Sequence, residues 1–141
     1  MLDTYTALGE KTGLSVSRKK VHQLGLWHKN AHIFVVNKKG EVLLQKRSPE
    51  KESNPNLWGG SAGGHIESGQ NSSEAAVRET EEELGVKFPL SDFEYIGTAR
   101  DQVVLNNGTY INNQFNDVYV VTTDFDKEKF KKQDSEVAEL R

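Results

Sequence analysis

Apolar and polar positions alternate in several short stretches of the chain, which is the pattern of β-strands. This pattern predicts strands at residues 31–36, 42–47, 94–99, 103–111 and 117–123. The sequence NKKG between the first two strands indicates a hairpin turn, and Asn107-Gly108 folds the segment 103–111 by the same kind of signal. Residues 48–57 contain two prolines and are predicted to form a loop, as is the acidic, lysine-rich stretch after residue 123.

In one segment, between Asn71 and Gly85, the apolar residues have the spacing of an α-helix. Asn71 can cap its N-terminus, with Glu74 three residues later as in a capping box, and Gly85 stands where a C-terminal cap is expected. At about 100° per residue, one apolar stripe should pack against the sheet, formed by Ala76, Val77, Thr80 and Leu84. One helix beside several strands predicts an α+β fold with a mixed sheet.

The length of the chain indicates one domain. Its 141 residues are enough for one hydrophobic core and too few for two. The longest apolar runs are too short to cross a bilayer, and the first ten residues lack the basic flank and apolar core of a signal peptide. We therefore expect a single domain over residues 1–141, in which residues 1–26 form an N-terminal arm.

The composition excludes several classes of function. The chain has no cysteine, so disulfides, thiolate metal sites and thiol nucleophiles are all absent. This absence fits a reducing environment, and we expect a cytoplasmic location. The net charge of -3 argues against a protein that binds nucleic acid, and the basic run at residues 18–20 is typical of a solvated surface.

The predicted helix carries an unusual concentration of acid. Glu79, Glu82 and Glu83 stand at i, i+3 and i+4, so they share a face apart from the apolar stripe. Arg78 is placed to pair with Glu82, Glu74 or both. The alternative is a charged surface helix, and the like-charged i,i+4 pair costs only about 0.2–0.5 kcal/mol. Repulsion alone therefore does not decide between a solvated face and a functional one.

A glycine-rich loop, GGHIESG at residues 63–69, leads directly into this helix. Glycines let the backbone approach other groups closely or adopt positive φ. Carboxylates that converge beside such a loop form an oxygen-ligand site suited to Mg²⁺ or Mn²⁺. A divalent cation would turn the repulsion between the carboxylates into attraction. The residues by themselves leave the metal site and the solvated acidic surface as equal alternatives.

Residues 64–86 resemble the Nudix box of MutT-like hydrolases, G-x5-E-x7-R-E-U-x-E-E-x-G-U, where U is a bulky apolar residue. The positions that match are Gly64, Arg78, Glu79, Glu82, Glu83, Gly85 and Val86. Two positions depart from the pattern, because Gln70 stands where the first glutamate belongs and Thr80 stands at an apolar position. An amide cannot supply the charge of an outer carboxylate, so Gln70 puts metal affinity or rate in doubt.

The resemblance extends beyond the box. From about Gly13 to its end, the chain is similar to the Nudix branch related to type I isopentenyl-diphosphate isomerase. This resemblance implies the Nudix fold, a mixed sheet sandwiched between helices with the box as a loop-helix-loop. Relatives of this type continue from a segment like SEVAELR into a further strand and a helix, so we expect that C-terminal strand and helix to be missing here.

As a hydrolase, the chain would use Mg²⁺ or Mn²⁺ to cleave a diphosphate linkage in a nucleoside diphosphate derivative, by attack of water at phosphorus. The resemblance implies that Glu79, Glu82 and Glu83 bind the metal. Glu79 is the best candidate to assist deprotonation of the water, and Arg78 would orient a glutamate through a charge-assisted hydrogen bond. The partner would be a small nucleotide-derived diphosphate, and neither nucleic acid nor a membrane is expected. Homodimers are common in this family.

Candidate substrate contacts are spread over the chain. Arg47 and Lys51 follow the second predicted strand and could grip phosphate, although solubility of the loop explains them as well. Trp27, Trp58 and Tyr110 could stack on a base, and each could equally anchor the core or a loop. The sequence therefore does not identify the substrate.

Two further functions are alternatives. The isomerase moves protons with a cysteine and a glutamate, and holds a metal with three histidines and two glutamates. The corresponding positions here are filled by His22, His28 and His65, by Gly63 for the cysteine, and by Asn112 and Gln114 for the glutamates. Without a thiol, isomerase activity is not expected, and the histidines are either scaffold or a metal site. The other alternative is a non-catalytic nucleotide-binding or sensing module, because the box lacks its first glutamate.

Overall fold

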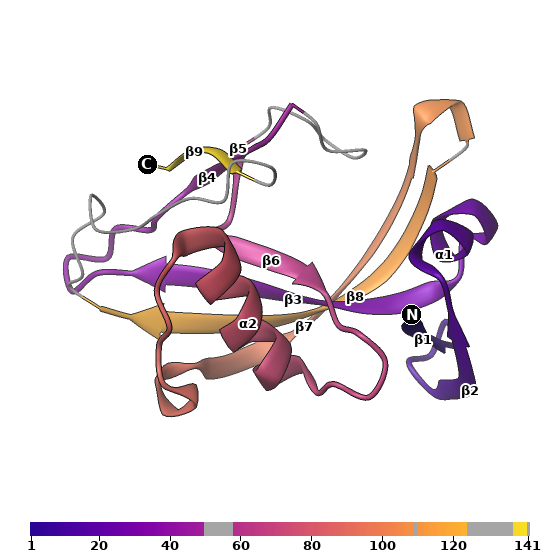
Figure 1. Cartoon of the computed structure of the whole chain (residues 1–141), viewed down its shortest axis with the longest axis horizontal. Helices are drawn as coiled ribbons and strands as arrows, with labels where there is room; N and C mark the ends of the chain where they lie inside the picture. The colour runs from indigo at the N-terminus through magenta and orange to yellow at the C-terminus, as the bar shows by residue number, and fades with distance from the viewer. Residues whose placement is uncertain (50–57, 109, 124–136, 141) are drawn as a thin grey trace.

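The computed structural model describes residues 1–49, 58–108, 110–123 and 137–140, which form two sheets and two α-helices (Figure 1). The large sheet has the order β2 (Lys11–Val16), β1 (Leu2–Tyr5), β3 (Trp27–Val36), β8 (Tyr110–Thr122) and β7 (Glu94–Leu105), with β6 (Ala62–His65) also paired to β3. The small sheet has the order β5 (Trp58–Gly59), β4 (Gln45–Arg47) and β9 (Val137–Leu140).

The large sheet is mixed, as the sequence predicts. β3 runs parallel to β8, and the other pairs of the sheet are antiparallel. β1 and β6 pair with different parts of the same side of β3, because Tyr5 lies opposite Trp27 while Ala62–His65 lie opposite residues 30–33. β6 therefore lies at an edge of the sheet. The α+β fold is confirmed.

The helix α2 (Ser72–Leu84) covers one face of the large sheet, as Figure 1 shows. The core lies between them and contains buried side chains from β3, from α2 and from β8, namely Ala31, Ile33, Val35, Ala75, Ala76, Leu84, Tyr119 and Val121. Because side chains alternate along a strand, the even-numbered residues of β3 face the opposite side of the sheet. That side carries His28 and Asn30, which are buried polar residues.

The observed helix agrees with its predicted caps and differs in one part of its stripe. Val77 is only half-buried, and Ala75 is buried instead. Thr80 is fully buried, and its hydroxyl donates to the Ala76 carbonyl oxygen at 2.7 Å. A hydroxyl that bonds within its own helix can be buried without an unsatisfied donor, which explains how a polar residue occupies an apolar position of the box.

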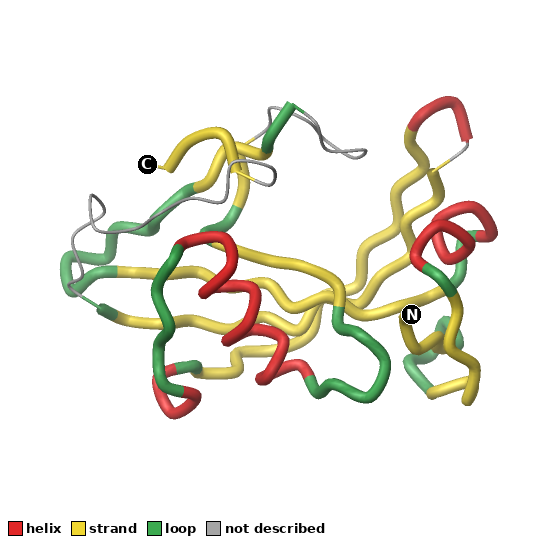
Figure 2. The backbone as a smooth tube through the Cα atoms, viewed as in Figure 1, coloured by secondary structure: helices red, strands yellow, loops and turns green. Residues whose placement is uncertain are grey.

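The second half of the chain forms one long hairpin in place of several separate strands. β7 is continuous from Glu94 to Leu105, so the predicted strand at 94–99 and the first part of the one predicted at 103–111 belong to one element. The turn lies at η2 (Asn106–Gly108), where Asn107 and Gly108 have φ of 56° and 87°, as the sequence signal predicts. Figure 2 shows this hairpin extending beyond α2 toward α1 (Arg18–Leu24). β7 is an edge strand, so polar residues in its middle stay hydrated and do not interrupt it.

The N-terminal and C-terminal segments contain further elements. Residues 1–26 form β1, β2 and α1, and the one-turn helix η1 (Leu90–Asp92) follows α2. The strand predicted at 42–47 is shorter, because β4 begins at Gln45. β9 lies in a stretch predicted to be loop, and it forms because β4 pairs with it across the sequence. The predicted loop at 48–57 and the stretch 124–136 lie partly or wholly outside the described residues. Neither α-helix described here is long and apolar enough to span a membrane.

Candidate active site

The helix α2 is held at both ends by the residues expected to cap it. Asn71 accepts a hydrogen bond from the Glu74 backbone N–H at 2.8 Å and donates one to the Glu74 carboxylate at 2.7 Å. Gly85 has φ of 75°, and its N–H donates to the Glu81 carbonyl oxygen at 2.9 Å. These bonds define where the helix begins and ends, and so where its acidic residues stand.

Gly64 makes room for the carboxyl group of Glu79. A Cβ atom placed on Gly64 would overlap the carboxyl group of Glu79, so no larger residue fits without moving that group. The side chain of Glu79 is only 13% exposed in this position. The glycine of the box therefore leaves the space that the Glu79 carboxyl group occupies.

Glu83 is the buried member of the acidic group, with 4% of its surface exposed. One carboxylate oxygen accepts from Gln45 Nε2 at 2.7 Å, and the other accepts from the Gly63 backbone N–H at 3.4 Å. Burial raises the pKa of Glu83 well above its usual value, and contact with Glu79 raises it further, against the opposing hydrogen bonds from Gln45 and Gly63. Two carboxyl groups in such contact form a site where a cation is favoured.

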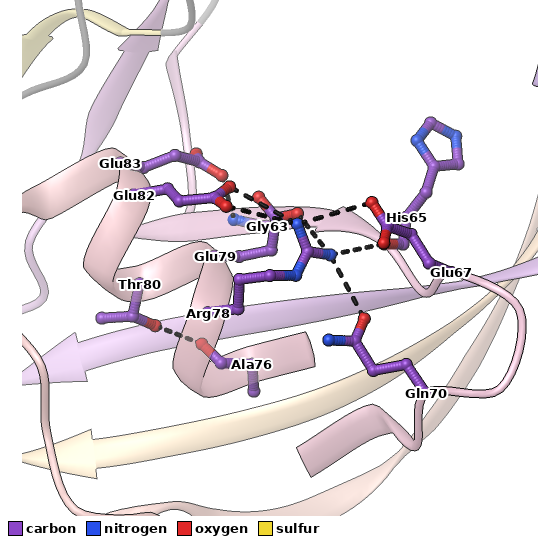
Figure 3. Close-up of polar contacts among 10 residues, drawn as sticks. All are labelled: Gly63, His65, Glu67, Gln70, Ala76, Arg78, Glu79, Thr80, Glu82 and Glu83. Carbon is purple, nitrogen blue, oxygen red and sulfur yellow. Dashed lines mark hydrogen bonds and ion pairs between the residues drawn. The ribbon is translucent and has the colours of Figure 1, made fainter. Parts of the chain in front are cut away.

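Arg78 connects the acidic face to the loop before the helix, as Figure 3 shows. Its guanidinium lies 3.1 Å from Glu79 and 3.5 Å from Glu82, and it donates to the His65 carbonyl oxygen at 3.3 Å. It also donates to Gln70 Oε1 at 3.3 Å. The amide of Gln70 therefore keeps a hydrogen-bonding role at this position, without the charge of a glutamate. The predicted pairing with Glu82 is confirmed, whereas Glu74 bonds to its cap.

The three glutamates of the box do not occupy equivalent positions. Glu79 and Glu83 are in contact, while Glu82 lies beside Arg78 with 46% of its side chain exposed. Oxygen ligands of this kind suit Mg²⁺ or Mn²⁺ rather than a softer metal. The mutual contact of two carboxyl groups beside a glycine backbone is the observation that fits such an ion.

A second polar cluster lies on the other side of β6. His22 of α1, His28 of β3 and His65 of β6 place ring nitrogens within 4.8 Å of one another. Among the described residues, this is the group of three side chains that could hold a metal ion with convergent ligand atoms. Imidazole nitrogens suit transition metals such as zinc. The two alternatives for these histidines, scaffold and metal site, both remain compatible with this geometry.

His28 is neutral and fully buried in this cluster. Its Nδ1 lies 3.2 Å from the Leu26 carbonyl oxygen, which only accepts hydrogen bonds, so Nδ1 carries the proton. Its Nε2 is then a bare lone pair, and it has no hydrogen-bond partner among the described residues. Burial lowers the pKa of His28 to about 4. Burial and the charge of Arg18 likewise lower the pKa of His22.

The aromatic candidates for base stacking are largely engaged elsewhere. Tyr110 is buried and stacks on His22 with 4.1 Å between ring centroids. Trp27 packs against Phe115 at 5.0 Å and against the Arg100 guanidinium at 4.6 Å. Trp58 lies on β5 with 40% of its surface exposed. The structure thus separates these three residues and does not form a single stacking surface from them.

The other candidates have mixed outcomes. Arg47 is half-buried on β4, near enough to His32 for its charge to lower the pKa of that histidine after the larger effect of burial. Lys51 lies outside the described residues. Gln114 accepts from Asn30 Nδ2 at 2.8 Å, and Asn112 stands on the same strand, β8. Gly63, at the position of the isomerase cysteine, offers only its backbone.

Gln45 and Ser61 are site residues that the sequence did not reveal. Both are buried, and Gln45 contacts Glu83 directly. A polar residue in a short strand before a proline-containing loop has no local feature that distinguishes it from a surface position. A signal exists only in the side-chain contacts of Gln45 with Ser61 and Glu83, which depend on the fold.

Together, these features define a class of protein: an α+β domain in which a glycine-rich loop and a capped helix present an acidic group at the edge of a mixed sheet. The chain belongs to the Nudix family, because the family model of the NUDIX domain matches residues 26–141.

Individual relatives agree with this assignment. The chain is 47% identical over 121 residues to Nudix hydrolase 3 of Arabidopsis thaliana, covering 85% of this chain and 16% of that protein. It is 34% identical over 109 residues to an isopentenyl-diphosphate Delta-isomerase of Serratia proteamaculans, covering 75% and 57%. The solved structure of DR0079 from Deinococcus radiodurans has the same fold, with a TM-score of 0.72 and 22% identity, covering 99% of this chain and 80% of that chain. The chain thus spans only part of these sequence relatives.

Proposed function

We propose that this chain is a hydrolase that uses Mg²⁺ or Mn²⁺ to cleave the diphosphate linkage of a small, nucleotide-derived molecule. The observation that carries the proposal is the contact between Glu79, seated against Gly64, and the buried Glu83. Two acids held this close are stabilised by a divalent cation, and a negatively charged diphosphate needs such a cation to be attacked.

Each residue of the acidic site has a role in this proposal. Glu79, Glu83 and Glu82 would bind the cation, which when bound neutralises phosphate charge and lowers the pKa of water. Glu79 would take a proton from the attacking water. The oxygen of that water would bond to phosphorus as the bridging P–O bond breaks. Arg78 would hold Glu79 in place, supported by its 3.1 Å ion pair with that side chain.

Isomerisation of an isoprenoid diphosphate has less support, even though one relative carries an isomerase name. The chain contains no cysteine, and Gly63 stands where the isomerase thiol would be. Proton transfer on that face of an alkene would lack its donor. We expect no isotope exchange with isopentenyl diphosphate, and detectable exchange would show that another group replaces the thiol.

The test of hydrolysis is a panel of nucleoside di- and triphosphates, dinucleoside polyphosphates and nucleotide sugars, incubated with Mg²⁺. Released phosphate products are measured for the wild-type protein and for Glu79→Gln. We expect turnover of at least one class of compound, abolished by Glu79→Gln. Tight binding of a nucleotide without turnover by the wild-type protein would favour the sensing module and overturn the hydrolase proposal.

A further inference from the structure

Gln45 of β4 uses both hydrogens of its side-chain amide. Its Nε2 donates to the Ser61 carbonyl oxygen at 2.9 Å and to Glu83 Oε1 at 2.7 Å. Because a carbonyl oxygen only accepts hydrogen bonds, the nitrogen end of the amide must face Ser61, which fixes its orientation. The same nitrogen then presents its remaining hydrogen to Glu83. The side chain is buried, with 6% of its surface exposed, so water does not compete for these bonds.

Ser61 anchors the other end of this contact. Its hydroxyl accepts from the Val35 backbone N–H at 2.7 Å and donates to the Leu43 carbonyl oxygen at 2.6 Å. Ser61 is fully buried and directly precedes β6. It thereby ties β3 to the segment before β4, so the carbonyl that holds Gln45 is itself held in place.

These bonds define the position of the Glu83 carboxylate. Gln45 bonds to Oε1, and the Gly63 backbone N–H bonds to Oε2 at 3.4 Å. Donors at both oxygens restrict rotation of the carboxylate. A hydrogen bond to an ionised group is roughly twice as strong as one between neutral groups, so the Gln45 bond also opposes the effect of burial on this acid.

We propose that Gln45 is a positioning residue, whose amide holds the Glu83 carboxylate beside Glu79 for binding of the divalent cation. This inference rests on the proposed function, because it assigns the acidic site to a cation. Gln45 lies outside the Nudix box and contacts the cation only through Glu83. Its backbone pairs with Gly59 and Leu140, so the sheet register does not depend on the amide.

The experiment measures Mn²⁺ affinity by electron paramagnetic resonance in the absence of substrate. Gln45→Met keeps the length of the side chain and removes both donors, and Gln45→Glu keeps the shape and replaces the donors by oxygen. We expect Gln45→Met to weaken Mn²⁺ binding about tenfold, as for other residues that hold a metal ligand in place. The matched control is Gln102→Met, at an exposed glutamine of β7, which should bind Mn²⁺ as the wild type does.

Kinetics separates positioning from a purely structural role. With a hydrolysed substrate from the panel, Gln45→Met should raise the half-saturating Mg²⁺ concentration about tenfold and lower kcat at saturating Mg²⁺ by a smaller factor. A residue that only stabilised the fold would lower the midpoint of thermal unfolding and leave the Mn²⁺ affinity of the folded protein unchanged. That second result would overturn the inference.

A measurement on the wild-type protein covers the case in which both variants fail to fold. Mn²⁺ broadens nuclear magnetic resonance signals of nearby groups, so the Gln45 side-chain amide should broaden at lower Mn²⁺ concentrations than the amide of Gln102. Equal broadening of the two amides would overturn the inference. Preferential broadening at Gln45 would support it.

The failure of the inference is distinguishable from that of the proposed function. If the wild type and Gln45→Met bind Mn²⁺ equally, only the role of Gln45 is overturned. If the wild type binds Mn²⁺ but hydrolyses nothing in the panel, the hydrolase proposal fails while the affinity comparison still decides the role of Gln45. If the wild type binds no Mn²⁺, both are overturned.

Discussion

Two polar clusters include neighbouring residues of the short strand β6, and one cluster is charged while the other is largely neutral. Gly64 lies against Glu79 on the side of α2, whereas the next residue, His65, joins the histidine cluster of His22 and His28. Consecutive side chains of a strand point to opposite faces, so one residue separates two sites on different sides of the sheet. The acidic cluster and the histidine cluster therefore share a scaffold without sharing a face.

The acidic cluster gathers negative charge and surrounds it with donors. Gln45, Gly63 and Arg78 all donate to its carboxylates or pair with them. The histidine cluster instead excludes charge, because burial lowers the pKa of His22 and His28. This difference supports the proposal that the acidic side binds a cation and a charged substrate. On the histidine side, burial favours the neutral forms of His22 and His28.

The largest expected effect is a loss of activity when a residue of the acidic cluster is changed, compared with a residue of the histidine cluster. Glu79→Gln should lower kcat/KM for the hydrolysed substrate about 1,000-fold, because loss of a general base costs roughly 10²–10⁴. His65→Ala, on the other face, should change kcat/KM by only a few fold. Steady-state kinetics on the folded variants checks both values, with Glu81→Gln as an exposed control on the same helix. Equal losses in Glu79→Gln and His65→Ala would show that the clusters act as one site.

The contact between Gly64 and the Glu79 carboxyl group gives the next largest expected loss of activity. Gly64→Ala places a methyl group where the Glu79 carboxyl group lies, so that carboxyl group must move. A displacement of about 1 Å at a catalytic group can cost roughly 100-fold, and we expect a loss of kcat/KM of that order. Gly59→Ala is the matched control, since a Cβ there meets nothing within 4 Å. Full activity in Gly64→Ala would mean that the position of Glu79 against the glycine is not used.

Changes at the histidine cluster should alter the pH dependence of the unfolding free energy rather than the kinetics. The pKa of His28 falls from 6.5 to about 4 on folding, so the unfolded chain binds the proton more readily. The stability that depends on neutral His28 is therefore complete above pH 6.5 and is lost as the pH falls toward 4. At pH 4.5 the loss of unfolding free energy is about 2.5 kcal/mol.

Urea unfolding at pH 7 and pH 4.5 measures this loss. His28→Gln should remove most of the pH dependence assigned to the histidine, so the difference between the two proteins isolates His28 from the carboxyl groups that titrate nearby. The same pH dependence in both proteins would contradict a neutral, buried imidazole at this position.

The smallest expected effect compares the caps of the two helices that carry these clusters. Asn71→Ala removes the cap of α2, which makes bonds of 2.8 and 2.7 Å to Glu74, and should lower the unfolding free energy by about 1 kcal/mol. Ser17→Ala at α1 removes a single bond of 3.4 Å to the Lys20 N–H and should cost less, about 0.5 kcal/mol. Chemical denaturation of both variants checks this order, and the reverse order would contradict it.

Much of the fold could be predicted because its signals are local. The caps of α2 at Asn71 and Gly85 are recognised within one turn of helix, and the Asn107-Gly108 turn follows from residues that tolerate positive φ. The register of the box likewise placed Arg78 beside Glu82. The continuous β7 and the added β9 were missed, because strand length depends on pairing with another strand, and β4, the partner of β9, is distant from it in the sequence.

By itself, the sequence determined the helix, the turn, the mixed α+β class and the set of acids and histidines available for chemistry. Only the tertiary structure decided that Glu83 is buried against Gln45, that Gly64 receives Glu79, and that three histidines from α1, β3 and β6 converge. The physical reason is the range of the interactions. Caps and turns are settled by neighbours along the chain, whereas burial and convergence depend on strands and helices that meet only in the folded protein.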